Sequence, residues 1–392
     1  MLVMTPSENK LKGGDFVIRD TDPATVFTPE SWNEEQMMMA QAMTEFIEQE
    51  YQPLGIMGVA ELDAEKDRDF IVGMLERAGE MGFCGMSIEE KYGGIDLDFN
   101  TSLLVGEALA KGLSFGTTLG AQTSIGSLPI VFYGTDAQKE KYLPGIASGE
   151  LKAAYALTEP GSGSDANSGR TKAVPTPDGK TYILNGQKMW ITNGGFADVF
   201  IVFAKIEDDK NLSAFIVERD FGGVTTGKEE KKMGIKASST VQVFFSDTPV
   251  PAENLLSERG AGFKIALNIL NTGRIKLAAG AVGGAKMAME QGIPYAIERK
   301  QFDTPIAEFG AIKHKIGEMT EQTFAMESAV FRTGYNIDQK FNEFVKAGLT
   351  PNEAKVKSVR EYAVECALLK VQGSESVSYV VDEVLQIFGG MG

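Results

Sequence analysis

The chain has 392 residues, of which 43% are hydrophobic and 23% charged, so it can build a sizeable core and more than one domain. Its formal net charge of −16, from 54 acidic and 38 basic residues, argues against nucleic acid or anionic lipid as a partner, because no local cluster of Lys and Arg overrides it. No apolar run approaches the roughly 18 residues of a membrane span, and no signal or transit peptide is visible. We therefore expect a cytoplasmic protein without a transmembrane segment.

Histidine and cysteine are too scarce for several classes of site. The one histidine, His314, would have to serve alone in a Ser-His-Asp triad or in a metal site, so both are disfavoured and no metal is expected. Cys84 and Cys366 stand far apart in the sequence and form neither a zinc knuckle nor a disulfide framework. We interpret them as small buried apolar residues.

Residues 30–151 are predicted to form an N-terminal helical domain, after an arm at 1–29 that has little periodicity. Ser31 and Glu34 have the spacing of a capping box, and the apolar residues that follow recur on one face of a helix. These apolar residues are Met39, Met43, Phe46 and Ile47. Further helices are expected at 67–81, 99–111, 117–132 and 137–147.

Residues 152–258 are predicted to form a β-domain, because the hydrophobic period changes from 3.6 towards 2. β-Branched and aromatic residues gather at 181–184, 199–204, 213–217 and 240–245, with turn signals between them. No helical pattern lies between these runs. An antiparallel sheet or barrel is therefore favoured over a doubly wound α/β fold.

Residues 259–392 are predicted to form a C-terminal helical domain, so the fold class is α+β with a helical, a β and a second helical part. Thr350-Pro351-Asn352-Glu353 combines a cap residue, a Pro at the first position and a Glu at the third. The apolar face that follows predicts one helix to Phe388, the longest of the chain at about 37 residues and about 55 Å. Such a helix packs against others in a bundle or across a subunit interface.

Three glycine-rich motifs are weak indicators of phosphate binding. The segment 161–166 matches GxGxxA, but a turn and a strand follow where a dinucleotide-binding fold requires a helix. The segment 222–228 has Walker A spacing, but Glu229 stands where Ser or Thr would bind magnesium, so we interpret it as a loop between strands. The cluster 280–284 lies within a helical pattern and is expected to permit close helix packing.

Two further segments, 158–165 and 186–194, have a composition suited to a flat cofactor. The first predicts a turn dense in hydroxyls and free backbone N–H groups, which suits a ring edge or a phosphate. The second places Trp190 and Thr192 two residues apart on one strand, so that an indole and a hydroxyl project together. An aromatic wall beside a hydrogen-bond donor is what a heteroaromatic ring needs. The alternative is a strand that buries Trp190 in an ordinary core.

These segments carry a resemblance to a known family. Residues 155–165 and 187–195 resemble the two signature segments of the acyl-CoA dehydrogenase flavoproteins, and 298–302 and 385–392 resemble two more, in the family's order. The resemblance covers residues 30–392. It is closest to the very-long-chain branch, through segments 118–126, 231–238 and 268–274. It implies a helical domain, a β-domain and a second helical domain, with FAD and the acyl thioester between them.

The resemblance also implies roles for individual residues around FAD. It places Leu157 and Thr158 on the flavin pyrimidine edge, Ser164 near the pyrophosphate and the substrate, and Trp190 and Thr192 beside the ring, with Thr192 towards N5. From a neighbouring subunit it places on the adenosine diphosphate part of FAD the residues Arg299, Phe302, Gln386 and Gly390. Each FAD would then be shared, so a homodimer or a dimer of dimers is expected. Many members have Gln where this chain has Gly310, and that contact is not carried over.

Three positions are implied to face the acyl-CoA substrate. Asn271 and Arg274 match residues on the CoA side, although a solvated helix face would account for both equally simply. Gly126 is compatible with a deep acyl channel, whereas Pro129 stands where the similar sequences have another small Gly.

The base that removes the α-proton of the thioester is missing from both of the family's positions. In most members it is a Glu that would lie beyond Gly392, and in a minority it immediately precedes the residue that matches Arg274, where this chain has Gly273. No catalytic residue is therefore assigned. We expect a C-terminally truncated portion of a longer enzyme, itself inactive, and the alternative is a complete flavoprotein without a base.

The function implied by the resemblance is the FAD-dependent dehydrogenation of a long-chain fatty acyl-CoA to trans-2-enoyl-CoA in β-oxidation. Electrons would pass to an electron-transfer flavoprotein. One alternative is an acyl-CoA oxidase, which passes electrons to oxygen. Another is a non-catalytic protein that binds FAD or acyl-CoA, or that serves in assembly.

Overall fold

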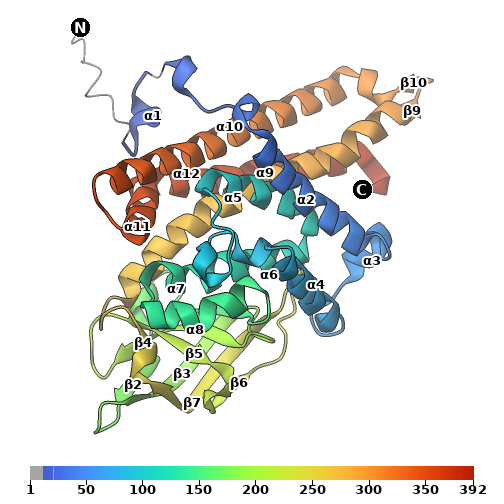
Figure 1. Ribbon diagram of the computed structural model, residues 1–392. Helices are drawn as coiled ribbons and strands as arrows, with labels where there is room; N and C mark the ends of the chain where they lie inside the picture. Colours follow the sequence, from blue (N-terminus) through green and yellow to red (C-terminus); the bar gives the residue numbers. More distant parts are fainter. Residues whose placement is uncertain (1–11, 21) are drawn as a thin grey trace. The chain divides into compact units, whose positions relative to one another are not determined.

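The computed structural model describes residues 12–20 and 22–392, and the chain falls into two compact units (Figure 1). Unit 1 comprises Met1–Thr44, Asp98–Lys111 and Asn271–Gly392, and unit 2 comprises Glu45–Leu97 and Gly112–Leu270. The order of helical, β and helical segments along the chain confirms the predicted fold class. The division at residues 29, 151 and 258 stays a prediction. Residues 1–11 and 21 of the predicted arm lie outside the described residues, and the helix α1 (Asp15–Ile18) lies within the rest.

Apart from one short hairpin, the regular elements among the described residues of unit 1 are helical. It contains the first part of α2 (Glu34–Tyr51) and most of α9 (Gly262–Glu298). Its other long helices are α5 (Phe99–Ala108), α10 (Gly310–Lys346), α11 (Pro351–Glu361) and α12 (Ala363–Phe388). The strands β9 (Lys300–Gln301) and β10 (Thr304–Pro305) pair as a hairpin between α9 and α10. Apolar side chains from five of these helices, Cys366 among them, form a buried core.

The prediction of one C-terminal helix, the longest of the chain, is wrong: the chain leaves the helix at Tyr362, between α11 and α12. The capping box of Thr350 and Glu353 is confirmed at the start of α11. Tyr362 has φ −101° and ψ 28°, and its ring is fully buried in the core of unit 1. Because Tyr362 also belongs to the apolar face, the hydrophobic pattern runs through the break without a signal. The longest helices are α9 and α10, with 37 residues each.

The predicted start of the first long helix also needs correction. Ser31 ends a 3₁₀ turn (Pro29–Ser31), and the reciprocal cap of α2 is formed by Asn33 and Gln36 instead. The Asn33 side chain accepts from the Gln36 amide at 2.9 Å, and the Gln36 side chain accepts from the Asn33 amide at 3.2 Å. The side chains of Asn33 and Gln36 therefore form the cap that the sequence analysis assigned to Ser31 and Glu34. The predicted apolar face is confirmed, with Met43, Phe46 and Ile47 buried.

Unit 2 contains helices of the N-terminal half and a large sheet. Its helices are α3 (Gly55–Glu61), α4 (Arg68–Glu80), α6 (Ser114–Ala121), α7 (Leu128–Tyr133) and α8 (Asp136–Ala147), and a π-helical turn covers Gln122–Gly126. The helix predicted at 117–132 is thus divided. Thr123 and Ser124 donate their hydroxyls to the carbonyls of Leu119 and Gly120, a bonding pattern that bends helices.

The sheet of unit 2 has eight strands in the order β6-β7-β3-β2-β4-β5-β8, with β1 paired to β4. Their bounds are β1 Ala153–Ala156, β2 Lys172–Pro175, β3 Thr181–Thr192, β4 Val199–Ile206, β5 Ser213–Glu218, β6 Val224–Thr226, β7 Thr240–Pro251 and β8 Leu255–Leu256. Most neighbours are antiparallel, as predicted, but β1 and β2 each pair with β4 in parallel. The strand β6 lies within 222–228, so that segment is more than the predicted loop.

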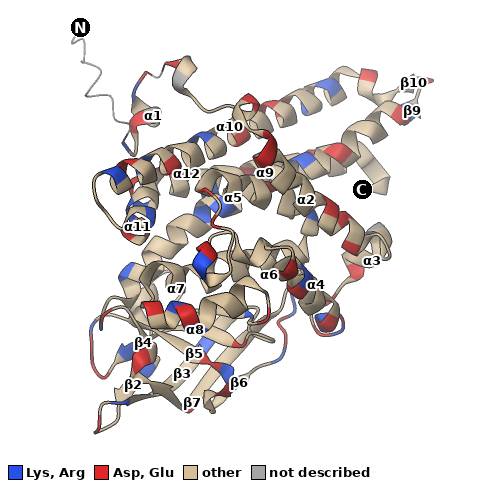
Figure 2. Ribbon diagram, viewed as in Figure 1, with Lys and Arg blue, Asp and Glu red and all other residues tan. Residues whose placement is uncertain are grey.

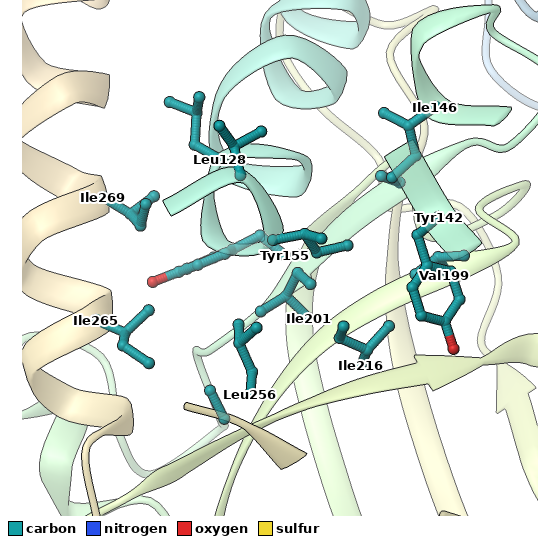
Figure 3. Packing of buried hydrophobic residues seen from close by; sticks show 14 of the residues in the cluster. Leu128, Tyr142, Ile146, Tyr155, Val199, Ile201, Ile216, Leu256, Ile265 and Ile269 are labelled. Carbon is teal, nitrogen blue, oxygen red and sulfur yellow. The ribbon is translucent and has the colours of Figure 1, made fainter. Parts of the chain in front are cut away.

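Both faces of the central strands are buried. Alternate residues of β1 and β4, such as Tyr155, Ile201 and Phe203, pack with helices α7, α8 and α9 (Figure 3). The intervening residues, such as Ala154 and Phe200, pack against β3, β5 and β7. A sheet covered on both sides is a rigid support for loops at its ends.

Charged side chains of both signs are interspersed along the helices, as expected from the absence of a basic cluster in the sequence (Figure 2). None of the helices within 12–20 and 22–392 combines the length and the apolarity that a bilayer crossing requires. The same residues contain no group of three or more His, Cys, Asp and Glu side chains arranged to hold a metal ion.

Candidate functional site

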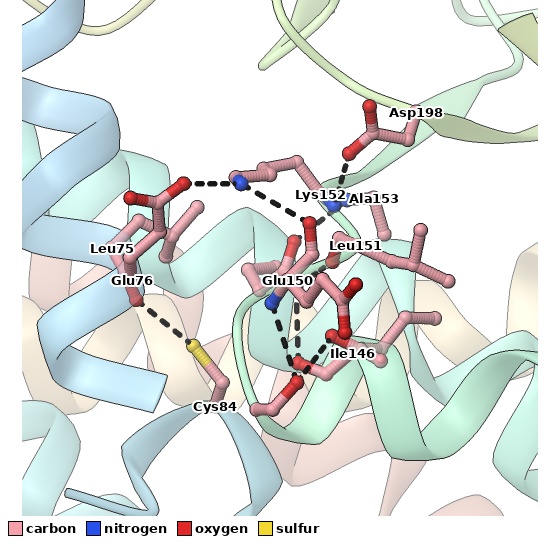
Figure 4. Close-up of polar contacts among 12 residues, drawn as sticks. Leu75, Glu76, Cys84, Ile146, Glu150, Leu151, Lys152, Ala153 and Asp198 are labelled. Carbon is pink, nitrogen blue, oxygen red and sulfur yellow. Dashed lines mark hydrogen bonds and ion pairs between the residues drawn. The ribbon is translucent and has the colours of Figure 1, made fainter. Parts of the chain in front are cut away.

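Polar contacts fix the start of β1, the strand that leads into the first signature segment (Figure 4). The Lys152 amide donates to Asp198 at 2.8 Å, and the Lys152 ammonium donates to Glu76 at 2.6 Å. The side chain of Gln122 accepts from the Ala153 amide at 2.7 Å and donates to the Leu151 carbonyl at 2.8 Å. β1 therefore ends at Ala156 in a defined position, and the signature segment follows directly.

The two predicted signature segments lie side by side. The Met189 amide donates to the Thr158 carbonyl at 2.9 Å. The Lys188 ammonium donates to the Leu157 carbonyl at 3.0 Å and to the Glu159 carboxylate at 2.7 Å. Residues that are about thirty positions apart in the sequence thus meet through three hydrogen bonds.

Lys188 and Glu159 form a buried ion pair, which the sequence analysis missed. The side chain of Lys188 is 0% exposed and that of Glu159 is 7% exposed. Burial lowers the pKa of Lys188 to about 8, against the opposing effect of Glu159. For Glu159, burial raises the pKa, but the charge and hydrogen bond of Lys188 and the amide of Arg170 lower it overall. The signal that could have found this pair is a Lys among the inward-facing positions of a buried strand.

Trp190 lies in a β-bulge near the end of β3. The register of β3 against β7 shifts between Lys188 and Ile191, and Trp190 has φ +61°. A bulge adds one residue and turns a side chain away from the regular alternation. The Trp190 side chain is 55% exposed, so the alternative in which it fills an ordinary core is wrong. Thr192, two residues on, is half-buried.

The turn after Thr192 is held by interior hydrogen bonds. Asn193 has φ +62° and is fully buried, and its amide group donates to the carbonyls of Thr118 and Ala153 at 3.0 and 3.4 Å. Arg219 donates to the carbonyls of Ala197 and Gly194 at 2.6 and 2.7 Å. These contacts position the end of β3 against β1, and neither Asn193 nor Arg219 was singled out from the sequence.

The turn 158–165 leaves backbone donors free. Ser162 donates its hydroxyl to the Asp165 carbonyl at 2.8 Å, and its amide pairs with Glu159. Ser164 is exposed, and its amide and that of Gly163 have no acceptor among the residues that the structure describes. The predicted turn with free N–H groups is present, next to an exposed indole on the neighbouring strand. A planar ring with an anionic tail fits this combination of groups.

The residues implied to contact FAD from a neighbouring subunit lie in unit 1. Arg299 and Phe302 belong to the hairpin between α9 and α10, where Phe302 is 90% exposed with φ +50°. Gln386 and Gly390 lie exposed at the end of α12. The rings of Tyr295 and Phe388 stack with centroids 4.4 Å apart, which joins the base of the hairpin to the end of α12. The four residues therefore belong to adjoining surface elements.

The residues implied to face the substrate are placed as follows. On α9, the Arg274 guanidinium donates to the Asn271 side chain at 2.5 Å, and Asn271 is buried, so a fully solvated face does not describe it. Gly273 lies between them, half-buried. Gly126 is buried in unit 2, where an added Cβ would lie 3.0 Å from the Ala153 Cβ. Its small size serves the packing of the π-helical turn on β1.

Comparison with known families covers nearly the whole chain. Three family models match in order: the acyl-CoA dehydrogenase N-terminal domain at residues 33–150, the middle domain at 154–248 and the C-terminal domain at 260–392. The chain belongs to the acyl-CoA dehydrogenase family. This confirms the resemblance drawn from the signature segments.

Individual acyl-CoA dehydrogenases are similar over most of this chain. A probable acyl-CoA dehydrogenase of Bacillus subtilis is 48% identical over 383 residues, which are 97% of this chain and 63% of the relative. The very-long-chain-specific mitochondrial enzyme of Rattus norvegicus is 44% identical over 81% of this chain and 47% of its own length. A crystal structure of an acyl-CoA dehydrogenase complexed with FAD from Bacillus anthracis superposes with a TM-score of 0.93 and 47% identity, over 97% of this chain and 64% of that one. The chain thus spans less than two thirds of these relatives.

Proposed function

We propose that this chain binds FAD and supplies most of the framework for dehydrogenating a long-chain fatty acyl-CoA to trans-2-enoyl-CoA, with electrons passing to an electron-transfer flavoprotein. The observation that carries the proposal is the junction of the two signature segments. There Lys188 and Met189 hold the carbonyls of Leu157 and Thr158, while Trp190 stays exposed. FAD, when bound, supplies the acceptor for the β-hydride of the acyl chain.

Each proposed role uses a group that this chain presents. Leu157 and Thr158 form the edge that receives the pyrimidine ring, the Trp190 indole forms a wall and the Thr192 hydroxyl donates towards N5. Ser164 and the free amide of Gly163 suit the pyrophosphate. In a dimer, Arg299 of one subunit brings a fixed positive charge to the diphosphate of the FAD bound by the other, beside Phe302, Gln386 and Gly390.

For the substrate, we propose that Asn271 and Arg274 bind the CoA side, that Ser164 lies near the acyl thioester and that Gly126 lies along the acyl channel. The α-proton requires a carboxylate base, and Gly273 offers no side chain for this step. We therefore propose that the 392-residue chain binds FAD but does not reduce it with palmitoyl-CoA. Rapid loss of the visible absorbance of the flavin on mixing with palmitoyl-CoA would contradict the proposed lack of reduction.

Replacing Trp190 with alanine is expected to weaken FAD binding about tenfold, because stacking on an aromatic face contributes about 1.4 kcal/mol. Equilibrium titration of the apoprotein with FAD, followed by fluorescence, measures the effect. Trp190→Phe is the matched control: it keeps an aromatic face and should bind within about threefold of the parent. Since Trp190 is more than half exposed, neither change should lower the melting temperature by more than a few degrees. Equal affinity of the alanine variant and the parent would contradict the proposed flavin wall.

A further inference from the structure

We propose that Lys188 is a positioning residue: it fixes the Leu157–Thr158 peptide so that the Thr158 amide donates a hydrogen bond to the flavin edge. This inference rests on the proposed binding of FAD. Lys188 itself is fully buried and does not reach the open side of the site. It would act through the backbone that it holds.

The argument begins with the direction of the carbonyls. Leu157 and Thr158 follow β1 without belonging to a strand, and the carbonyls of both accept hydrogen bonds from residues of β3. The Leu157 carbonyl accepts from the Lys188 ammonium at 3.0 Å, and the Thr158 carbonyl accepts from the Met189 amide at 2.9 Å. Leu157 and Thr158 are therefore joined to β3 through their carbonyl oxygens.

The direction of the Thr158 donor follows from peptide geometry. In a planar trans peptide, the N–H lies opposite to the carbonyl of the preceding residue. Because the Leu157 carbonyl points at the Lys188 ammonium, the Thr158 N–H points away from that ammonium. No described residue accepts from this amide, and Thr158 is half-buried rather than enclosed. The Thr158 N–H is thus held in one direction and is available to an acceptor on a bound ligand.

The Lys188 ammonium makes two contacts at this position. Lys188 donates to the Glu159 carboxylate as well as to the Leu157 carbonyl, and Glu159 also accepts from the amides of Arg170 at 2.6 Å and Thr171 at 3.1 Å. This buried pair thereby joins residues 157–159 to β3 and to the two residues that precede β2. A buried ion pair contributes little net stability, so we assign this one a role in positioning.

The test compares two neutralised pairs of the same chemistry. The first is Lys188→Met with Glu159→Gln, which keeps the side-chain volumes and an acceptor for the two backbone amides but leaves nothing to bond the Leu157 carbonyl. The control is Lys286→Met with Glu107→Gln, which neutralises a partly exposed Lys–Glu contact of 2.7 Å in unit 1, where Lys286 also contacts Glu327. For the whole 392-residue chain, the measurements are the dissociation constant for FAD, the visible spectrum of bound flavin and the melting temperature of the apoprotein.

The site pair is expected to weaken FAD binding about tenfold or more and to shift the visible flavin band, because one oriented donor is lost. The control pair is expected to lower the melting temperature while FAD affinity stays within about twofold. Lys188→Gln, which retains a donor for the Leu157 carbonyl, should recover most of the affinity and the parent spectrum.

Two results would overturn the inference: parent-like affinity and spectrum in the site pair, or an equal loss of affinity in the control pair, which would show a general effect of lost stability. If the site pair folds poorly, the single Lys188→Gln variant still tests the inference. A Lys188→Gln variant that is as stable as the parent but binds FAD tenfold more weakly would contradict the donor argument. Failure of the unaltered chain to bind FAD is a different outcome, and it would overturn the proposed function together with this inference.

Discussion

Replacing Gly283 with alanine is expected to lower the free energy of unfolding by about 3 kcal/mol. Gly283 lies where α9 meets α5, and an added Cβ would stand 2.1 Å from the Glu107 carbonyl oxygen and 2.7 Å from the Ala110 Cβ. The obstructing oxygen belongs to helix backbone, so the two helices would have to separate. The cluster 280–284 was interpreted from the sequence as permitting close helix packing, and this contact confirms it.

Gly280 provides the matched control in the same helix, one turn away. An added Cβ there meets no atom within 4 Å. Gly280→Ala should therefore raise the free energy of unfolding by about 0.5–1 kcal/mol, because glycine in a helix loses more conformational entropy on folding than alanine does. Urea denaturation of the three proteins measures both effects. Similar midpoints for the two variants would contradict the packing argument.

The sequence was a good guide wherever a local pattern determines the structure. The apolar spacing of Met43, Phe46 and Ile47 predicted a buried helix face, and the Thr350 capping box predicted the start of α11. It failed where the apolar pattern continues through a break in the helix. Tyr362 continues the apolar face of its helix, yet the backbone leaves the helix there, and periodicity carries no information on that choice.

The candidate site shows the same division. Residue types at 158–165 and 187–195 indicated a turn and an aromatic strand, and the resemblance assigned their partners. The alternation of a regular strand predicted the direction of Trp190, but the bulge between Lys188 and Ile191 adds a residue, so the side chain's position depends on the pairing with β7. Lys188 and Glu159 are twenty-nine residues apart, and only the fold shows that their charges meet.

The second large effect concerns pH and lies in unit 1. The Asp338 carboxylate of α10 accepts hydrogen bonds from the amides of Phe99 at 2.9 Å and Asn100 at 2.8 Å, at the start of α5. Burial, followed by the negative charge of Asp98, raises the pKa of Asp338 from 3.8 to about 7, although the two amides oppose the shift. Two carboxylates therefore share one helix start, and the protonated form of Asp338 is favoured in the folded state.

The sign of the effect follows from proton linkage. Between about pH 4 and pH 7 the folded chain holds a proton on Asp338 that the unfolded chain has released, so stability falls as pH rises across this window. The stabilising contribution is complete below about pH 4 and is lost above about pH 7. For a shift of this size the expected loss is about 2–4 kcal/mol between pH 4.5 and pH 7.5.

The asparagine of the Asp338→Asn variant does not titrate. Between pH 4.5 and pH 7.5, the free energy of unfolding of this variant should therefore fall by about 2–4 kcal/mol less than that of the parent. Asp208→Asn is the control, because the Asp208 side chain is 96% exposed and its removal should leave the slope unchanged. The chain's net charge of −16 adds a general loss of stability at high pH, but that loss is nearly the same in all three proteins and cancels in the comparison. Equal slopes for the parent and Asp338→Asn would show that the carboxylate is already ionised in the folded state, held by the two amides at the start of α5.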